Sequence, residues 1–528
     1  MKRTTAATQR PKDERGGAEP VMTKGARGVV RRRRARPPFD DSSDGGVPFG
    51  LDLDANVLYE IIRTRDRRFD GRVFVGVRST GIYCRPVCTV RPPRFENCSF
   101  YPTAAAAERA GFRPCLRCRP ELAPGTIAPV DAVPRLSALA VRRIEDGALS
   151  GRSLDELAAE FGVTARHLRR AVRQETGLTP VELAQTQRLL LVKQLLTDTR
   201  MTVTEAAFAA GFESLRRFNA AFKERYRLTP TALRRSAAGA GPDDAYRFDL
   251  AVRPPFDLAA LLGFWATRVT PGVDRVKDGW YHRTAVLGDQ AGWVAIGPGG
   301  KPHTVRVLVS TALGSVLPAV LARLKAMLDT RADPVEVGGR LAADPLLRPL
   351  VARWPGPRVP GAFDGFECGV RAILGQQISV RAANTLAGRL AARFGRLRQY
   401  PHEGLAMVFP PPATLAAAGI ADLVAVGVTT RRAETIRALA RAVADGQVRL
   451  EFGADPDRVR AGLLALPGVG DWTAEYLLLR AVGWPDAFPA GDLGLAKASG
   501  LAATELRARA ERWRPWRGHA AVLLWMSL

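Results

Sequence analysis

Four of the six cysteines form two close pairs with the spacing of metal ligands. Three residues separate Cys84 from Cys88, and two separate Cys115 from Cys118. Two chelating pairs of thiolates suit a tetrahedral Zn²⁺ ion. Six cysteines in 528 residues are too few for a disulfide framework. The spacing therefore predicts one zinc site with four thiolates, in a protein of a reducing compartment.

A second group of residues that could do chemistry lies near the end of the chain. Residues 463–476 read as a helix, a hairpin bounded by Gly468 and Gly470, and the start of a new helix. Small residues in such a hairpin let a DNA phosphate approach backbone N–H groups. A helix-hairpin-helix is one interpretation, and an ordinary turn between two helices is the other.

Two aromatic residues and an acid accompany this hairpin. Trp472 and Tyr476 are four residues apart, so one face of a helix presents both rings. Asp492 follows in a segment that contains Gly and Pro. Taken by themselves, such a ring pair is more often core packing, and an acid in this position is more often a helix N-cap.

Composition indicates several domains and a polyanionic partner. The chain has 528 residues, of which 46% are hydrophobic and 25% charged, and Lys and Arg exceed Asp and Glu by 26. Such an excess favours nucleic acid or an acidic membrane surface as partner. No apolar run approaches the ~20 residues that span a bilayer, and the basic start is not followed by an apolar segment. We expect a soluble, unexported, cytoplasmic and nucleoid-associated protein with no membrane partner.

Changes in periodicity predict a multidomain protein, mainly α with α+β parts. Strand-like runs at 72–77, 293–296 and 304–309 contrast with helical runs at 103–110, which Thr103 would cap, and at 316–328. Linkers rich in Gly and Pro separate the parts. The expected parts are a disordered basic arm (1–48), a small α/β zinc domain (51–124), an all-α double helix-turn-helix domain (133–237), an α+β domain (245–355) and an all-α helix-hairpin-helix domain (360–528). A dispensable tail is the alternative for 1–48.

Two stretches, 154–163 and 203–212, look like copies of one pattern. Each has a helix with small residues, a Gly turn and then a second helix rich in basic residues. This is the helix-turn-helix pattern, whose second helix enters the major groove of DNA. The basic residues expected to face DNA are Arg166, Arg169, Arg170, Arg173, Arg216 and Arg217. With Thr179-Pro180 and Thr229-Pro230 after the two motifs, the segment resembles the AraC-type DNA-binding domain.

The residues around the cysteine pairs resemble a known zinc domain. Segments 74–88, 96–101 and 110–120 are closely similar to the N-terminal zinc domain of the Ada family of methylation-damage sensors. The resemblance implies that Cys84 takes a methyl group directly and irreversibly from a methylphosphotriester in DNA. It also implies DNA contacts by Thr80, Arg91 and Arg117. A zinc site that only stabilises the fold is the alternative.

The last part of the chain resembles the AlkA family of 3-methyladenine DNA glycosylases, within the helix-hairpin-helix superfamily. The resemblance extends over 245–528 and is carried by 365–379, the hairpin, 488–495 and 511–517. It implies that Asp492 is the catalytic carboxylate and that Trp472, Tyr476 and Trp516 form the base pocket. A monovalent cation at the hairpin is a further expectation.

Three positions differ from other glycosylases of this kind. The residue that wedges into the gap left by the flipped base is Leu in AlkA, and Gln377 occupies that position here. Leu493 replaces the aromatic residue that follows the catalytic acid. Relatives that also cleave the strand carry Lys at the position of Trp472, where it forms a Schiff base. The chain is therefore expected to excise bases without cleaving the strand.

These resemblances combine into one expected function. The protein would take methyl groups from DNA methylphosphotriesters, regulate transcription with RNA polymerase as a partner, and hydrolyse the N-glycosidic bond of alkylated purines of the 3-methyladenine class. No Pro-Cys-His motif occurs in the sequence, so direct reversal of O6-methylguanine is not expected. The alternative is a transcriptional regulator whose glycosylase-like half binds DNA without activity.

Overall fold

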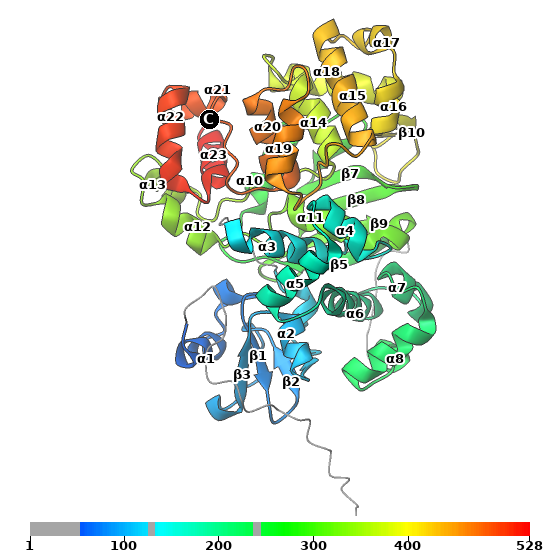
Figure 1. Cartoon of the computed structure of the whole chain (residues 1–528), viewed down its shortest axis with the longest axis vertical. Helices are drawn as coiled ribbons and strands as arrows, with labels where there is room; N and C mark the ends of the chain where they lie inside the picture. The colour runs from blue at the N-terminus through cyan, green and yellow to red at the C-terminus, as the bar shows by residue number, and fades with distance from the viewer. Residues whose placement is uncertain (1–52, 125–131, 236–243) are drawn as a thin grey trace, which may run out of the picture. The chain divides into compact units, whose positions relative to one another are not determined.

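The computed structural model describes residues 53–124, 132–235 and 244–528. Contacts between Cα atoms divide the chain into two units, Met1–Ser43 and Asp44–Leu528, and every described residue belongs to the second. The basic arm predicted at 1–48 lies outside the described residues. Figure 1 colours the described residues by their position in the chain, from blue at the N-terminus to red at the C-terminus.

The first segment is a small four-stranded sheet with short helices. Its strand order is β3-β1-β2-β4, and only the β2–β4 pair among these strands is parallel. The hydroxyl oxygen of Thr103 accepts a hydrogen bond from the N–H of Ala106 at 3.1 Å, so the predicted N-cap is present. The elements are α1 (Ala55–Arg63), β1 (Phe74–Val77), β2 (Ile82–Cys84), β3 (Cys98–Tyr101), α2 (Ala104–Arg109) and β4 (Arg113–Pro114).

The second segment consists of helices and contains the same helix pair twice, α4–α5 and α7–α8. Thr164 and Ser214 begin the second helix of each pair by accepting hydrogen bonds from backbone N–H groups. Leu168 on α5 and Phe218 on α8 are fully buried and fix which face is turned outward. The helices are α3 (Ala132–Glu145), α4 (Leu154–Glu160), α5 (Ala165–Thr176), α6 (Pro180–Asp198), α7 (Val203–Ala209), α8 (Leu215–Tyr226) and α9 (Pro230–Arg235).

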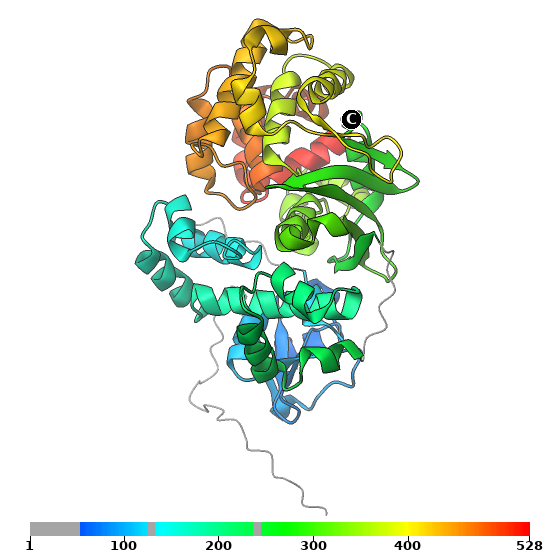
Figure 2. The ribbon, with the colours of Figure 1, turned by 90° about the vertical axis from the view of Figure 1, so that its right-hand side faces the viewer.

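The third segment begins with an antiparallel sheet of order β5-β9-β8-β7-β6. Alternate residues of its strands are buried, as Val305, Val307 and Val309 show, because one face packs against α10 and α11. Figure 2 shows α11 against the green strands. The predicted strands and helix appear as β8, β9 and α11. The elements are β5 (Ala245–Ala251), α10 (Leu258–Ala266), β6 (Asp274–Lys277), β7 (Trp280–Leu287), β8 (Gln290–Pro298), β9 (Thr304–Ser310) and α11 (Leu317–Met327).

The part expected to be helical, 360–528, is mostly helical, and the run of helices begins earlier, at Pro334. A short antiparallel pair, β10 (Arg396–Leu397) with β11 (Met407–Val408), departs from the all-α expectation. Because α15 ends before Gly395, the extended chain that follows must pair its backbone groups elsewhere. The helices are α12 (Pro334–Leu341), α13 (Arg348–Arg353), α14 (Gly365–Leu374), α15 (Val380–Phe394), α16 (Pro412–Ala417), α17 (Ile420–Val424), α18 (Thr430–Ala444), α19 (Pro456–Leu464), α20 (Asp471–Leu477), α21 (Leu493–Ser499), α22 (Ala503–Ala510) and α23 (Arg517–Met526).

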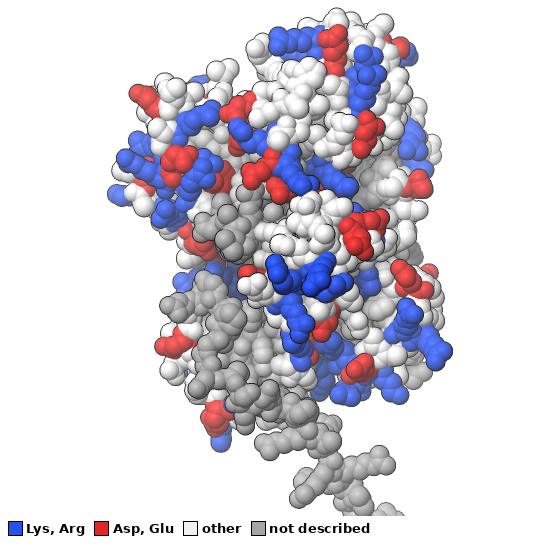
Figure 3. Space-filling model, viewed as in Figure 1, with Lys and Arg blue, Asp and Glu red and all other residues white. Residues whose placement is uncertain are grey.

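The excess positive charge is spread over many side chains. On the face drawn in Figure 3, Lys and Arg side chains form several groups with Asp and Glu between them. A large part of the arginines is engaged in ion pairs within the fold. Among the helices of the described segments, none combines the length and the apolar character needed to cross a bilayer.

Candidate functional site

Parallel pairing of β2 with β4 brings the two cysteine pairs together. Cys84 ends β2, and Cys115, directly after β4, donates its backbone N–H to the carbonyl oxygen of Tyr83 at 3.0 Å. The sulfur atoms of Cys84, Cys88, Cys115 and Cys118 lie within 4.8 Å of one another. Four thiolates at this spacing can all reach one Zn²⁺ ion, whose bonds to sulfur are about 2.3 Å long. The predicted four-thiolate site is confirmed.

A buried arginine joins the two cysteine pairs. The backbone N–H of Arg85 donates to the sulfur of Cys118 at 3.4 Å, and its Nη1 donates to the carbonyl oxygens of Cys118 and Arg119 at 3.1 and 3.2 Å. The same guanidinium pairs with Asp70, and both side chains are less than a tenth exposed. Because a buried charge needs a partner, the ion pair and the geometry of the cysteines depend on each other.

Arg85→Met is expected to destabilise the zinc-loaded segment by about 3–5 kcal/mol, because it leaves the carboxylate of Asp70 buried without a partner. Urea titration of the full chain, followed by zinc release to a coloured chelator, measures the change. Arg68→Met is the matched control, since Arg68 is 56% exposed in its pair with Asp66 and such pairs contribute at most about 1 kcal/mol. Equal loss in both variants would show that the buried pair does not support the site.

The residues predicted to contact DNA in the first two segments lie on the surface. Thr80 is exposed in the turn between β1 and β2, and Arg91 and Arg117 are exposed near the cysteines in sequence. On the helix-turn-helix segment, α5 and α8 present the predicted arginines outward; the exposed residues are Arg166, Arg169, Arg170, Arg173, Arg216 and Arg217. Their contacts with DNA stay predictions.

The predicted hairpin connects α19 to α20. Gly468 has a φ of +78°, and a Cβ atom there would lie 2.1 Å from the hydroxyl oxygen of Thr435, so both the backbone and the space require glycine. Gly470 is the N-cap of α20, and its Cβ position is open. Gln376 Nε2 donates to the carbonyl oxygen of Gly468 and to the hydroxyl of Thr473, both at 3.1 Å, which ties the hairpin to the loop after α14.

Asp492 lies next to the hairpin helix and accepts three hydrogen bonds. Its Oδ2 accepts from Trp472 Nε1 at 2.8 Å, and its Oδ1 accepts from Trp525 Nε1 and from the backbone N–H of Leu495, both at 3.0 Å. The last bond makes Asp492 the N-cap of α21. The carboxylate is therefore a helix cap and also the acid that faces the rings, although the two roles were alternatives in the sequence.

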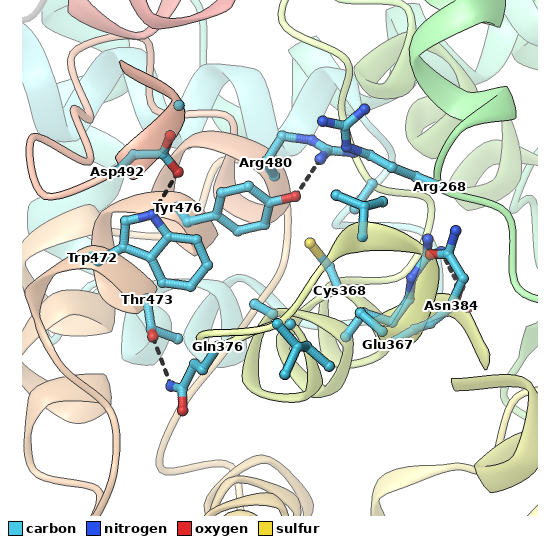
Figure 4. A pocket seen from close by; sticks show the side chains of 18 of the residues that line it. Arg268, Glu367, Cys368, Gln376, Asn384, Trp472, Thr473, Tyr476, Arg480 and Asp492 are labelled. Carbon is cyan, nitrogen blue, oxygen red and sulfur yellow. Dashed lines mark hydrogen bonds and ion pairs between the residues drawn. The ribbon is translucent and has the colours of Figure 1, made fainter. Parts of the chain in front are cut away.

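Three aromatic rings stand beside this acid in a cavity of about 1240 Å³. Trp472 and Tyr476 are stacked, with ring centroids 5.4 Å apart and planes at 21°, as their spacing on one helix predicts. Trp525 meets Tyr476 edge-on at 6.1 Å. Figure 4 shows the indole of Trp472 below Asp492 and the phenol of Tyr476 beside it. The arrangement provides aromatic faces for a planar base next to a negative charge.

Trp516 is not brought to this cavity. It is 5% exposed, packs edge-on against His519 with ring centroids 5.5 Å apart, and belongs to the hydrophobic cluster around α22 and α23. Trp525 occupies the place for which Trp516 was predicted. The start of α23 separates the two: Trp516 is the N-cap that precedes the helix, whereas Trp525 lies in its last turn and donates to Asp492.

Replacing Trp525 by Phe is expected to lower kcat, whereas replacing Trp516 by Phe is expected to lower stability. Trp525→Phe removes an N–H donor to Asp492 and should lower kcat for base release about tenfold, since hydrogen bonds to charged groups contribute about 1.5–3 kcal/mol. Trp516→Phe should leave kcat of the folded enzyme near wild type and reduce the free energy of unfolding by about 1–2 kcal/mol. Single-turnover kinetics and urea titration measure the two effects. A similar fall of kcat in both variants would contradict this assignment.

Gln377 and Leu493 lie at the rim of the cavity. Gln377 is exposed and has a φ of +56°, so the loop projects its side chain from a turn. Leu493 is 84% exposed. Sequence analysis missed Phe264 and Arg268, which line the cavity from α10 and the residues just after it. They lie more than 200 residues before Asp492 in the chain, and no local motif marks them.

Four family models match consecutive stretches of the chain. The metal binding domain of Ada matches residues 57–121, and a helix-turn-helix domain matches 157–236. The AlkA N-terminal domain matches 247–364, and the HhH-GPD superfamily of base excision DNA repair proteins matches 370–504. The zinc-domain match contains the cysteine quartet, and the helix-turn-helix match contains the end of α4 and all of α5, α7 and α8. The HhH-GPD match contains the hairpin and Asp492.

Curated relatives match most of the chain or about half of it. The chain is 42% identical to the probable bifunctional transcriptional activator/DNA repair enzyme AlkA of Mycobacterium tuberculosis, over 89% of this chain and 96% of that protein. It is 36% identical to DNA-3-methyladenine glycosylase 2 of Escherichia coli, over 52% of this chain and 95% of that protein. Among solved structures, the 3-methyladenine DNA glycosylase of Archaeoglobus fulgidus is 26% identical, covers 53% of this chain and 97% of that chain, and has a TM-score of 0.46. The chain thus belongs to the family of bifunctional transcriptional activator/DNA repair enzymes that join an Ada-type zinc domain and a helix-turn-helix domain to an AlkA-type glycosylase.

Proposed function

We propose that the third segment hydrolyses the N-glycosidic bond of alkylated purines in DNA and leaves the strand intact. The observation that carries this proposal is the carboxylate of Asp492 held by the indoles of Trp472 and Trp525 at the wall of the cavity, next to the hairpin. A nucleotide flipped out of the duplex can enter this cavity. An alkylated purine is cationic, so the electron-rich rings attract it and the bond to the sugar breaks readily.

Asp492 would stabilise the positive charge that develops on the sugar as the bond breaks. Its two oxygens receive N–H groups from two indoles and from the backbone, and these donors fix its orientation before the substrate arrives. Among the residues that line the cavity in the described part of the chain, none is lysine. A Schiff base with the sugar needs an amine, so the lining supports hydrolysis without strand cleavage.

The experiment is a base-release assay on a duplex treated with a methylating agent. Release of 3-methyladenine, with the strand cleaved only after alkali, is the expected result. Strand cleavage without alkali would contradict the monofunctional proposal. Absence of release together with tight binding of the duplex would support the alternative, a regulator whose third segment only binds DNA.

We infer further that Cys84 accepts the methyl group of a methylphosphotriester. Zinc, when bound, keeps the four thiols ionised while the sulfur atoms remain nucleophilic. The thiolate of Cys84 would attack the methyl carbon, a sulfur–carbon bond would form, and the oxygen–carbon bond would break to leave a phosphodiester. Cys84 and Cys118 are partly exposed, whereas Cys88 and Cys115 are buried, so exposure leaves two sulfur atoms that DNA can reach. The resemblance to the Ada zinc domain favours Cys84 of these two.

DNA is the partner of the two DNA-binding parts, and recruitment of RNA polymerase by the helix-turn-helix segment is proposed here as the route to transcription control. The exposed arginines of α5 and α8 support contact with DNA over two adjacent stretches of major groove. Footprinting on candidate promoters, with and without polymerase, tests this. The monovalent cation at the hairpin stays a prediction.

A further inference from the structure

The end of the cavity away from Asp492 offers hydrogen-bond donors. Arg480 Nη1 donates to the hydroxyl oxygen of Tyr476 at 2.6 Å. Because a guanidinium has no acceptor, the phenol oxygen must accept this bond, and its own hydrogen remains available to another group. Figure 4 shows this hydroxyl directed toward Arg480 and Arg268, on the side of the ring opposite Asp492.

Arg268 adds further donors at the same end. Its Nη1 donates to the carbonyl oxygen of Phe264 at 3.2 Å and to the hydroxyl of Thr267 at 2.8 Å, while Nε and Nη2 have no acceptor among the described residues. The guanidinium of Arg268 lies 3.7 Å from the ring centroid of Phe264, and that of Arg480 lies 4.7 Å from the same centroid. The ring of Phe264 thus holds both guanidinium groups at the cavity wall.

Two carboxylates that also line the cavity, those of Glu367 and Asp274, already have partners inside the fold. Glu367 pairs with Arg283 at 2.6 Å and with Arg371 at 3.4 Å. Asp274 accepts a hydrogen bond from the hydroxyl of Tyr281 at 2.8 Å. Their acceptor capacity is used inside the fold, so a base that reaches this end meets N–H and O–H groups.

We propose that this donor end, formed by Arg268, Tyr476 and Arg480, makes the cavity prefer alkylated purines with a 6-keto group over those with a 6-amino group. The inference rests on the proposed glycosylase function. 3-Methylguanine presents O6 and N7, both acceptors, whereas 3-methyladenine presents an amino donor beside N7. When the sugar end of the base faces Asp492, the six-membered ring extends toward the donors. A site built to donate rejects an analogue that cannot accept. Arg268 is the specificity-determining residue, because two of its three guanidinium nitrogens, Nε and Nη2, have no acceptor among the described residues, whereas Arg480 uses both Nε and Nη1 inside the fold.

DNA methylated with dimethyl sulfate contains both 3-methylguanine and 3-methyladenine, which are matched in the position of the methyl group. The release of each base is measured by mass spectrometry and divided by its uncatalysed rate of loss. We expect the corrected kcat/KM to favour 3-methylguanine by at least about tenfold, or about 1.4 kcal/mol. Arg268→Met should bring the ratio close to one, mainly through slower release of 3-methylguanine, and Arg268→Lys should retain part of the preference.

Arg353→Met is the matched control. The guanidinium of Arg353 lies 4.4 Å from the ring centroid of Trp354, outside the lining of this cavity, so its loss should leave the ratio unchanged. Thermal denaturation checks that each variant is folded.

A second measurement separates this inference from the proposed function. Quenching of tryptophan fluorescence gives the affinity of the full chain for each free base without any catalysis. Tighter binding of 3-methylguanine that Arg268→Met removes would support the donor end even if no base were released from DNA, which would defeat only the glycosylase proposal. The inference would be overturned if the wild type bound 3-methylguanine no more tightly than the Arg268→Met variant does. It would also be overturned if the wild type bound 3-methyladenine more tightly than 3-methylguanine.

Discussion

Asp492→Asn is expected to lower the rate of 3-methyladenine release at least about 1000-fold, or about 4 kcal/mol. The substitution keeps the shape of the side chain and an oxygen that can still accept the N–H of Leu495. It removes the negative charge that would face the sugar as positive charge develops. The oxygen that keeps the bond to Leu495 also serves Trp525, so the amide NH₂ group faces the indole N–H of Trp472, which loses its acceptor. Single-turnover release from alkylated duplex measures the loss.

Asp257→Asn is the control for this change. Asp257 is an exposed N-cap that accepts a hydrogen bond from the N–H of Ala260 at 2.9 Å, outside the cavity around Asp492. It should retain wild-type release, with stability changed by at most about 1 kcal/mol. Substantial activity in Asp492→Asn would refute the assignment of this acid, whatever the control shows.

Cys84→Ser is expected to abolish methyl transfer from a methylphosphotriester to the protein. A serine hydroxyl at neutral pH is a far weaker nucleophile than a zinc-bound thiolate. The other three cysteines keep their backbone contacts: the N–H groups of Cys88 and Cys115 donate to carbonyl oxygens, and the sulfur of Cys118 accepts from a backbone N–H. Mass spectrometry of the wild-type chain after incubation with methylated DNA should show one added methyl group on Cys84. The variant should show none.

Cys98→Ser is the matched control for that experiment. Cys98 is a buried thiol of the same segment that donates to the carbonyl oxygen of Arg94 at 3.3 Å and does not belong to the quartet. The Cys98→Ser variant should gain one methyl group on Cys84, as the wild type does. A wild-type chain that gains no methyl group, while holding zinc, would favour the alternative of a site that only stabilises the fold.

Much of the architecture follows from local sequence. Thr103 caps α2, and the strands and helix expected at 293–296, 304–309 and 316–328 are all present, because alternation and helical periodicity report directly on which face is buried. The short β10–β11 pair was not predicted. Each of its strands has two residues, too few for alternation to be detectable, and their pairing is set by where α15 ends.

The residues of the two sites likewise fall into those that the sequence predicts and those that it does not. The cysteine quartet, and Trp472 with Tyr476, depend on short spacings that a strand pair or one helix turns into contacts. Trp516 and Trp525 could not be told apart without knowing where α23 begins, and Arg268 reaches the cavity only through the packing of α10, far away in sequence. Residues that belong to a recognisable sequence motif were predicted, and residues such as Arg268 and Trp525 that only tertiary packing brings to the cavity were not.

Asp492 is both the N-cap of α21 and the acid beside the aromatic rings, and this affects how relatives without activity would be recognised. A descendant that had stopped processing lesions would still gain from an acid that begins α21, so selection for a well-ended helix would preserve it long after the chemistry had disappeared. The two indole N–H groups that donate to the carboxylate do not cap a helix. In a relative that has lost repair activity, the two tryptophans would therefore be replaced before the acid, and the presence of the acid alone would not indicate activity.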